Sequence, residues 1–136
     1  MFENLDLTQS LSKSHYQEYY PPLKDQLREL QRAVVESGRS VLIVFEGMEA
    51  SGKGDSIGQV VAPLDPRGFK VHLTRMQMTE EEQLRPNLWR YWLNIPGKGE
   101  IGIFDCSWYM PSITQRVQGE LDEHAWSVRK DEIKQF

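Results

Sequence analysis

Cysteine is almost absent from the sequence: Cys106 is the only one among 136 residues, so no disulfide can form within the chain. A single cysteine fits a reducing compartment. Long apolar runs are missing too, because no stretch approaches the roughly 20 residues that cross a bilayer. The acidic and polar start, MFENLDLTQS, is unlike a secretory signal. These absences lead us to expect a cytoplasmic protein.

The sequence also lacks a basic excess: 16 lysines and arginines face 20 aspartates and glutamates, which gives a formal net charge of −4. This balance argues against bulk binding to nucleic acid or to an acidic membrane. It still allows a local group of lysines and arginines to hold a polyanionic substrate. The three histidines are scattered, and with one cysteine they show no spacing typical of a metal site.

With 39% hydrophobic and 26% charged residues, the chain has the composition and length of one globular domain, residues 1–136. Its first part predicts a helix whose apolar positions recur at helical spacing: Leu23, Leu27, Leu30 and Val34. Pro21 and Pro22 fit the start of this helix, and Gly38 fits its end. We therefore expect residues 1–38 to form an N-terminal helical extension within the domain.

Three short apolar runs predict strands at residues 40–46, 69–73 and 100–105. The first is continuous and rich in β-branched residues, as expected for a central parallel strand buried on both faces. Helical patterns lie over 53–62, from 79 with an interruption at Pro86, from about 112, and from 122 to the end. Thr79 and Glu82 form a capping-box signal. This alternation predicts an α/β fold with a mostly parallel sheet flanked by helices.

The segment from Gly47 to Lys53 follows the first predicted strand and matches the spacing G-x-x-x-x-G-K. Such glycines let backbone N–H groups converge on a phosphate, and the lysine reaches its oxygens. The predicted phosphate-binding residues are Gly47, Ala50, Ser51, Gly52, Lys53 and Gly54. The alternative is a glycine-rich turn with an exposed lysine, but the position between a buried strand and a helix favours a phosphate loop.

Gly54 occupies the position where a serine or threonine usually holds Mg²⁺, so a metal ion would need other ligands. Asp105 ends the third apolar run, where a carboxylate commonly lies beside the Mg²⁺ of a phosphate loop. Glu49, inside the loop, could share the metal or orient an acceptor, or it could be a solvated loop residue. Ser56 is a weaker candidate ligand.

Several stretches together resemble the polyphosphate kinase type 2 family: FEGMEASGKG, LDPRGFKV, WRYW…IPGKGEIGIFDCSWY, QRVQGEL and DEIKQF. The opening MFENLDLTQSLSKSHY and the segment RPNLWRYW are most similar to the N-terminal unit of two-unit polyphosphate:AMP phosphotransferases. The resemblance implies a P-loop, thymidylate-kinase-like fold and Mg²⁺-dependent phosphoryl transfer between polyphosphate and nucleotides. It also implies that Gly-Lys-Gly is a family feature, with Lys53, Asp105 and Glu49 as the catalytic residues.

The chain departs from the family pattern in several places. Glu49 stands where many members have aspartate, and Cys106 stands where the family has arginine in Asp-Arg-Ser-Trp-Tyr. Met110 and Pro111 follow where active members commonly carry polar or basic residues. A helical lid with further arginines is expected beyond this point in the family, so the domain looks truncated before the lid. The N-terminal unit of the two-unit members is often thought catalytically eroded.

Other residues leave two interpretations open. Arg75, Arg85, Arg90 and Arg116 could line a polyphosphate track, or they could be solvated helix charges paired with nearby glutamates. The tryptophans, with Tyr91 and Tyr109, could stack on a base, although aromatics at helical spacing more often belong to a core.

The leading hypothesis is a Mg²⁺-dependent phosphotransferase that acts on inorganic polyphosphate and AMP or ADP. The alternatives are a catalytically eroded, phosphate-binding accessory unit and an ATP-dependent small-molecule kinase. The partners expected are polyphosphate, a nucleotide, and a second copy or a second family unit, with no nucleic acid or membrane.

Overall fold

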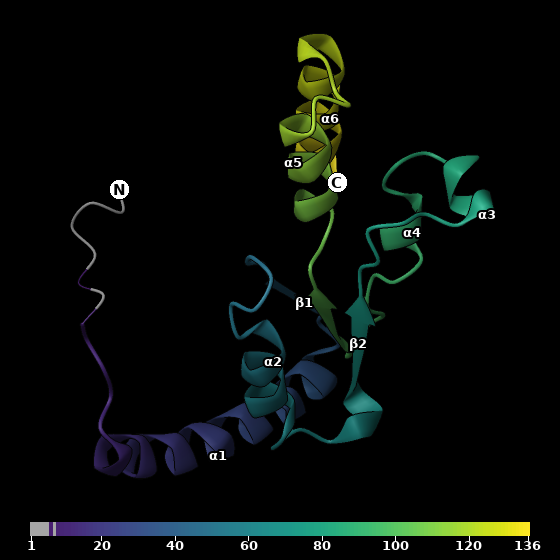
Figure 1. Ribbon diagram of the computed structural model, residues 1–136. Helices are drawn as coiled ribbons and strands as arrows, with labels where there is room; N and C mark the ends of the chain where they lie inside the picture. The colour runs from purple at the N-terminus through teal and green to yellow at the C-terminus, as the bar shows by residue number, and fades with distance from the viewer. Residues whose placement is uncertain (1–5, 7) are drawn as a thin grey trace.

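The computed structural model describes residue 6 and residues 8–136 (Figure 1). Residues 1–5 and 7, which hold part of the expected N-terminal extension and of the family-like opening, lie outside the described residues. Within the described part, no helix is both long and apolar enough to cross a membrane.

The sheet has three parallel strands in the order β1 (Val41–Phe45), β3 (Ile101–Asp105) and β2 (Phe69–Leu73). The prediction of a mostly parallel α/β sheet is confirmed. The prediction that the first run forms the central strand is wrong within the described residues, because β3 lies between the other two. Residues 101–104 of β3 are all buried, whereas β1 is mostly half-buried. The central position therefore explains why β3 has the most buried side chains.

Helix α1 (Lys13–Ser37) precedes the sheet and begins earlier than expected. The Ser12 side chain caps it by accepting a hydrogen bond from the His15 amide. Pro21 and Pro22 therefore lie inside the helix and do not start it, because the Ser12 cap supplies the start signal. The predicted end is confirmed: Gly38 caps the helix with φ 63°, a left-handed conformation that suits glycine.

Helix α2 (Lys53–Val61) follows β1 and agrees with the predicted helix. Its buried Ile57 packs with Leu64, Ile101 and Ile103 in one core cluster, which α1 and β1 help to cover. The short helix η1 (Pro66–Gly68) then leads into β2. This cluster packs the middle and the end of α2 against the sheet.

A second core cluster lies on the other side of β3 and consists of Leu88, Tyr91, Phe104 and Trp108. The helices near it are α3 (Glu80–Gln83), α4 (Trp89–Trp92), α5 (Tyr109–Val117) and α6 (Glu123–Gln135). The capping box of Thr79 and Glu82 and the helix restart after Pro86 are confirmed.

Helix α5 begins at Tyr109, earlier than expected. The buried Ser112 donates a hydrogen bond to the Trp108 carbonyl at 2.8 Å within its first turns. In Figure 1 the strands run from the side of α1 toward the side of α4 and α5. The carboxyl ends of the strands therefore open toward the C-terminal helices, where ligands bind in open parallel sheets.

Candidate functional site

The loop between β1 and α2 is folded tightly at two left-handed positions. Ala50 has φ 59° and Gly52 has φ 83°, and the Ser51 amide donates to the Met48 carbonyl at 3.2 Å. A Cβ atom on Gly47 would lie 2.6 Å from the Ser51 hydroxyl, so only glycine fits there without a shift. The loop therefore has the compact geometry in which backbone N–H groups can gather around an anion.

Lys53 begins α2 and turns back over this loop. Its Nζ atom donates to the Gly47 carbonyl at 2.9 Å and to the Met48 carbonyl at 2.8 Å. An open hollow of ≈ 350 Å³ at the start of the helix is lined by Ala50, Gly52, Lys53, Gly54 and Asp55. The structure thus brings together four of the predicted phosphate-binding residues, while Gly47 and Ser51 shape the loop from outside the hollow.

Asp105 lies at the end of β3, opposite Phe45 at the end of β1. The pKa of the next residue, Cys106, is affected by burial and by three charged side chains. Burial raises the pKa of its thiol, the Lys53 charge lowers that pKa, and the Glu46 and Asp105 charges raise it. Lys53, Glu46 and Asp105 therefore lie close enough to Cys106 to act on it, at one edge of the sheet.

Glu49 is exposed on the loop. Among the described residues, no group of three or more histidine, cysteine, aspartate or glutamate side chains is arranged to hold a metal ion. Mg²⁺ commonly takes only one or two protein carboxylates and completes its shell with water and phosphate oxygens. The Asp105 carboxylate at the end of β3 could supply one such ligand, whereas the described residues offer no all-protein metal cage.

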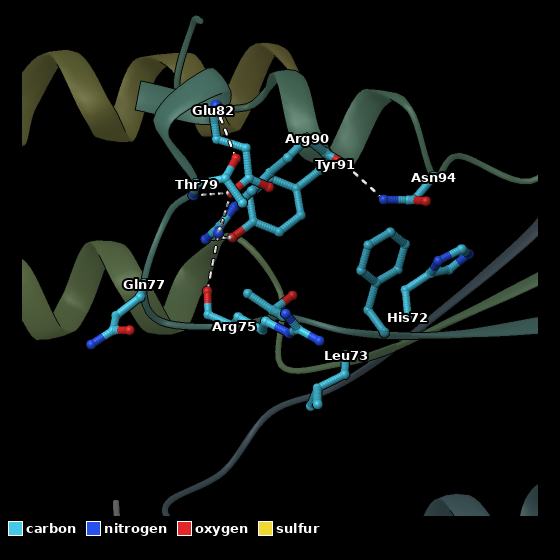
Figure 2. Close-up of a pocket in the computed structure, with 11 residues that line it drawn as sticks. His72, Leu73, Arg75, Gln77, Thr79, Glu82, Arg90, Tyr91 and Asn94 are labelled. Carbon is cyan, nitrogen blue, oxygen red and sulfur yellow. Dashed lines mark hydrogen bonds and ion pairs between the residues drawn. The ribbon is translucent and has the colours of Figure 1, made fainter. Parts of the chain in front are cut away.

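A pocket of ≈ 260 Å³ lies at the end of β2, between that strand and α4 (Figure 2). Its walls include His72 and Arg75 from the β2 side, and Arg90, Tyr91 and Asn94 from the α4 side. Burial lowers the pKa of His72, with a smaller effect of the Lys70 charge in the same direction. Burial also raises the pKa of Tyr91. The pocket has both polar and apolar walls and lies near the carboxyl edge of the sheet.

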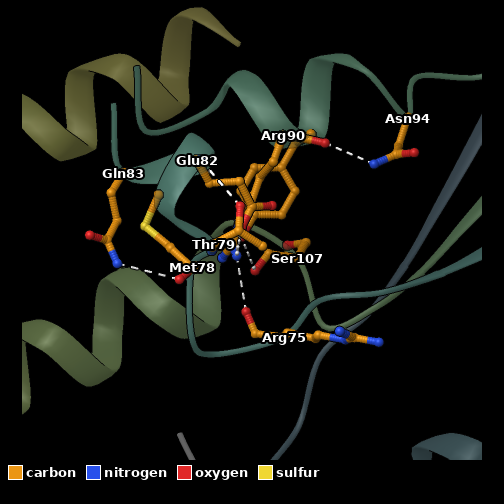
Figure 3. A network of polar contacts seen from close by, with 9 residues as sticks. Arg75, Met78, Thr79, Glu82, Gln83, Arg90, Asn94 and Ser107 are labelled. Atoms are coloured by element: carbon orange, nitrogen blue, oxygen red, sulfur yellow. Dashed lines mark hydrogen bonds and ion pairs between the residues drawn. The ribbon is translucent and has the colours of Figure 1, made fainter. Parts of the chain in front are cut away.

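Arg90 is the centre of the polar network in this pocket (Figure 3). Its guanidinium donates to the Arg75 carbonyl at 3.0 Å and to the Tyr91 hydroxyl at 2.9 Å, and lies 3.9 Å from Glu82. The side chain is only 11% exposed, and its buried Nε atom has no partner among the described residues. One donor of a buried cation is therefore left without a hydrogen-bond partner among the described residues.

The predicted arginine track is only partly assembled. Arg75 and Arg90 meet in the same pocket, but Arg116 lies at the end of α5 and donates to the Leu121 carbonyl and to Glu123. Arg85 stacks over the Trp89 ring and pairs with Glu81 at 3.7 Å. The solvated-pair interpretation thus describes Arg85 and Arg116 better than Arg75 and Arg90.

The aromatic residues divide in a similar way. Trp108 and Tyr91 are 7% and 3% exposed and pack edge to face, so the core interpretation is confirmed for both. Trp92 is 57% exposed and Tyr109 is 43% exposed, so neither belongs to the buried core.

The sequence did not reveal the contact between Glu46 and Ser107. One oxygen of the Glu46 carboxylate accepts hydrogen bonds from the Ser107 amide at 2.8 Å and from its hydroxyl at 2.5 Å. The two residues are 61 positions apart, and Ser107 is fully buried. The sequence does show that Glu46 directly follows β1 and that Ser107 comes two residues after the end of β3, and the ends of these strands are neighbours in the parallel sheet.

Comparison with known proteins agrees with this architecture. Residues 10–136 match the family model described as Polyphosphate kinase 2. A polyphosphate:AMP phosphotransferase from Pseudomonas syringae pv. tomato is 36% identical over 136 residues, which is 100% of this chain and 27% of the relative. A polyphosphate:AMP phosphotransferase from Acinetobacter johnsonii is 38% identical over 83% of this chain and 24% of its own length.

Solved structures are similar as well. A polyphosphate kinase 2 structure from Pseudomonas aeruginosa PA01 superposes with a TM-score of 0.86 at 32% identity, over 96% of this chain and 29% of that one. A polyphosphate kinase 2 structure from Arthrobacter aurescens TC1 gives a TM-score of 0.87 at 26% identity, over 96% and 49%. The chain spans about a quarter of the length of the two phosphotransferases, and it matches their N-terminal portion. On the matching residues and the shared fold, this chain belongs to the polyphosphate kinase 2 family.

Proposed function

We propose that this domain takes part in phosphoryl transfer between inorganic polyphosphate and a nucleotide, AMP or ADP, with Mg²⁺. The observation that carries the proposal is the position of Lys53, whose ammonium folds back over a compact glycine-framed loop and which lines the hollow at the start of α2. Relatives named polyphosphate:AMP phosphotransferase and ADP-polyphosphate phosphotransferase support the substrate class.

In this proposal the backbone N–H groups of residues 50–54 and the Lys53 ammonium hold phosphate oxygens. The positive end of α2 adds to their attraction, because unpaired N–H groups point out of the helix start. Asp105 would hold Mg²⁺ together with phosphate and water oxygens, and Glu49 would orient the acceptor or share the metal. When bound, Mg²⁺ would neutralise charge on the phosphates.

The pocket beside β2 is proposed to receive part of a substrate. Its Arg75 and Arg90 side chains supply positive charge that would attract phosphate oxygens. Arg116 could join only if it gave up its contacts with Leu121 and Glu123.

A specific observation favours a second candidate, a phosphate-binding unit without catalysis of its own. Cys106 directly follows Asp105 at the site edge, where the family pattern has an arginine. A thiol cannot supply the fixed, charged pair of donors with which arginine holds a phosphate. Such a unit would bind polyphosphate and support a second family unit or a second copy of this chain.

The two candidates separate in one experiment. The purified chain is incubated with polyphosphate, Mg²⁺ and AMP or ADP, and new nucleotide phosphate is measured alongside tripolyphosphate binding. Formation of ADP or ATP that is lost in Lys53→Ala supports the phosphotransferase. Binding without turnover, with turnover gained in Cys106→Arg, supports the non-catalytic unit. Absence of both binding and turnover contradicts both proposals.

A further inference from the structure

We propose that Glu46 is a positioning residue, which holds the phosphate loop and Asp105 in register through its contact with Ser107. The inference rests on the proposed function, because it concerns how the same site is kept in shape. Glu46 directly follows β1 and precedes Gly47, the first residue of the loop. Ser107 comes shortly after Asp105 on the chain that leaves β3.

The contact joins the two chain segments just beyond the last pair of the sheet. Phe45 and Asp105 are the final partners of β1 and β3, and the Cys106 amide still donates to the Phe45 carbonyl at 3.0 Å. Beyond that bond, the Glu46 carboxylate accepts hydrogen bonds from both the amide and the hydroxyl of Ser107. Because both donors belong to one residue and meet at one oxygen, the contact fixes the backbone and the side chain of Ser107 together. The Glu46 contact thus extends the pairing of the two strands into the site.

The chain between Asp105 and Ser107 is held in a strained conformation. Cys106 has φ 57°, in the left-handed region that non-glycine residues rarely adopt. Such a conformation persists only where neighbouring contacts impose it. Besides the three bonds already described, the Thr74 hydroxyl donates to the Cys106 carbonyl at 2.6 Å, which ties the turn to the end of β2. Ser107 is itself fully buried, so it offers Glu46 a fixed anchor.

The same glutamate acts on the other half of the site. The carbonyl of the next residue, Gly47, is one of the two that the Lys53 ammonium binds. A shift of the chain at Glu46 would therefore move the anchor of Lys53 and the turn after Asp105 at the same time. Holding both is the role that we assign to Glu46, and its own charge is not required to touch phosphate or metal.

Two substitutions at Glu46 separate the effect of side-chain length from the effect of side-chain charge. Glu46→Gln removes the charge but keeps a side-chain oxygen at the same distance, which can accept both Ser107 donors. Glu46→Asp keeps the charge but shortens the side chain by one methylene. Positioning predicts that Gln behaves like glutamate and that Asp is impaired, whereas a direct charge role predicts the reverse. Glu18→Ala, at an exposed position on α1, serves as the control.

The first measurement does not depend on phosphate binding: it is the hydrogen-exchange rate of the Ser107 amide in the folded protein. We expect a rate within about threefold of wild type in Glu46→Gln, and about tenfold faster exchange in Glu46→Asp. Equal rates in the two variants, or faster exchange only in Glu46→Gln, would overturn the inference.

The second measurement is the affinity for tripolyphosphate with Mg²⁺. We expect Glu46→Gln to bind within about twofold of wild type, and Glu46→Asp to bind about tenfold more weakly. Adding Ser107→Ala to Glu46→Asp should weaken binding less than Ser107→Ala does alone, because the two residues act through one contact. Fully additive losses would contradict that coupling. If the wild-type chain bound no tripolyphosphate, the proposed function would fail, and the exchange rates would still decide whether Glu46 fixes this turn.

Discussion

The Nζ atom of Lys53 lies 2.9 Å from the carbonyl oxygen of Gly47, so the lysine that starts α2 is bonded to the residue that starts the preceding loop. This contact closes the loop into a ring of backbone and side chain. It also holds in place the lysine that lines the hollow at the start of α2, where an anion would meet the helix N-terminus.

Replacing this lysine should weaken phosphate binding strongly. In Lys53→Ala we expect the affinity for tripolyphosphate to fall by about 10- to 100-fold, since a hydrogen bond to a charged group is worth roughly 1.5–3 kcal/mol. Isothermal titration calorimetry of the purified chain measures this directly. Lys98→Ala, at an exposed turn distant from the loop in sequence, should bind as wild type does. Equal losses in both variants would indicate nonspecific attraction.

Adding a single methyl group to the loop should be harmful in a way that a second change repairs. The Cβ of Gly47→Ala would meet the Ser51 hydroxyl at 2.6 Å, so the loop must shift and tripolyphosphate affinity should drop by about tenfold. The double variant Gly47→Ala/Ser51→Ala lacks that hydroxyl and should recover most of the affinity. Gly58→Ala in α2 meets no atom within 4 Å and should leave binding unchanged. A double variant as weak as Gly47→Ala would show that the clash is not the cause.

The left-handed turn at Cys106 makes a prediction about stability. Glycine adopts φ 57° without a steric penalty, whereas alanine keeps the clash of its Cβ atom. Cys106→Gly should therefore exceed Cys106→Ala in free energy of unfolding by about 1 kcal/mol, as measured by urea denaturation. Both variants lose the thiol, so their difference isolates the backbone term. If the alanine variant were the more stable one, the assigned conformation of this turn would be wrong.

His72 predicts a pH dependence of stability. Its pKa is lowered in the folded protein, first by burial and then by the Lys70 charge, so the unfolded chain binds the proton more readily. Its contribution to stability is complete above the unfolded pKa, and is lost as the pH falls through that value toward the lower folded pKa. The decrease in Tm between about pH 7.5 and pH 5.5 should be smaller in His72→Gln than in wild type. His124→Gln, at an exposed position, should keep the wild-type pH dependence.

Much of the fold could be predicted because local signals are strong. Alternation predicts the β2 segment, and the turn formers after the loop helix predict where α2 ends. The Thr79–Glu82 box predicts the start of a helix that the structure confirms. Four of the six predicted loop residues, Ala50, Gly52, Lys53 and Gly54, also line one hollow because they are neighbours in sequence.

Sequence patterns fail where distant contacts determine the strand order, or where competing local signals determine where a helix begins. Pro21 suggested a helix start, but the cap at Ser12 begins the helix earlier. The apolar run of β1 suggested a central strand, although the order of strands depends on pairings that no single segment encodes. The contact between Glu46 and Ser107 was missed for the same reason, because it joins positions 61 residues apart. Local sequence patterns therefore predict the loop, whereas long-range contacts determine which strands and side chains lie next to it.

The central claim is that the Lys53 loop and the Asp105 carboxylate serve one phosphate and its Mg²⁺ ion. The most direct test is the affinity for tripolyphosphate with and without Mg²⁺, in wild type and in Asp105→Asn. We predict that Mg²⁺ strengthens binding in wild type by about tenfold or more, and that Asp105→Asn loses this increase while it keeps the metal-free affinity. An increase with Mg²⁺ that is the same in Asp105→Asn and in wild type would contradict the claim.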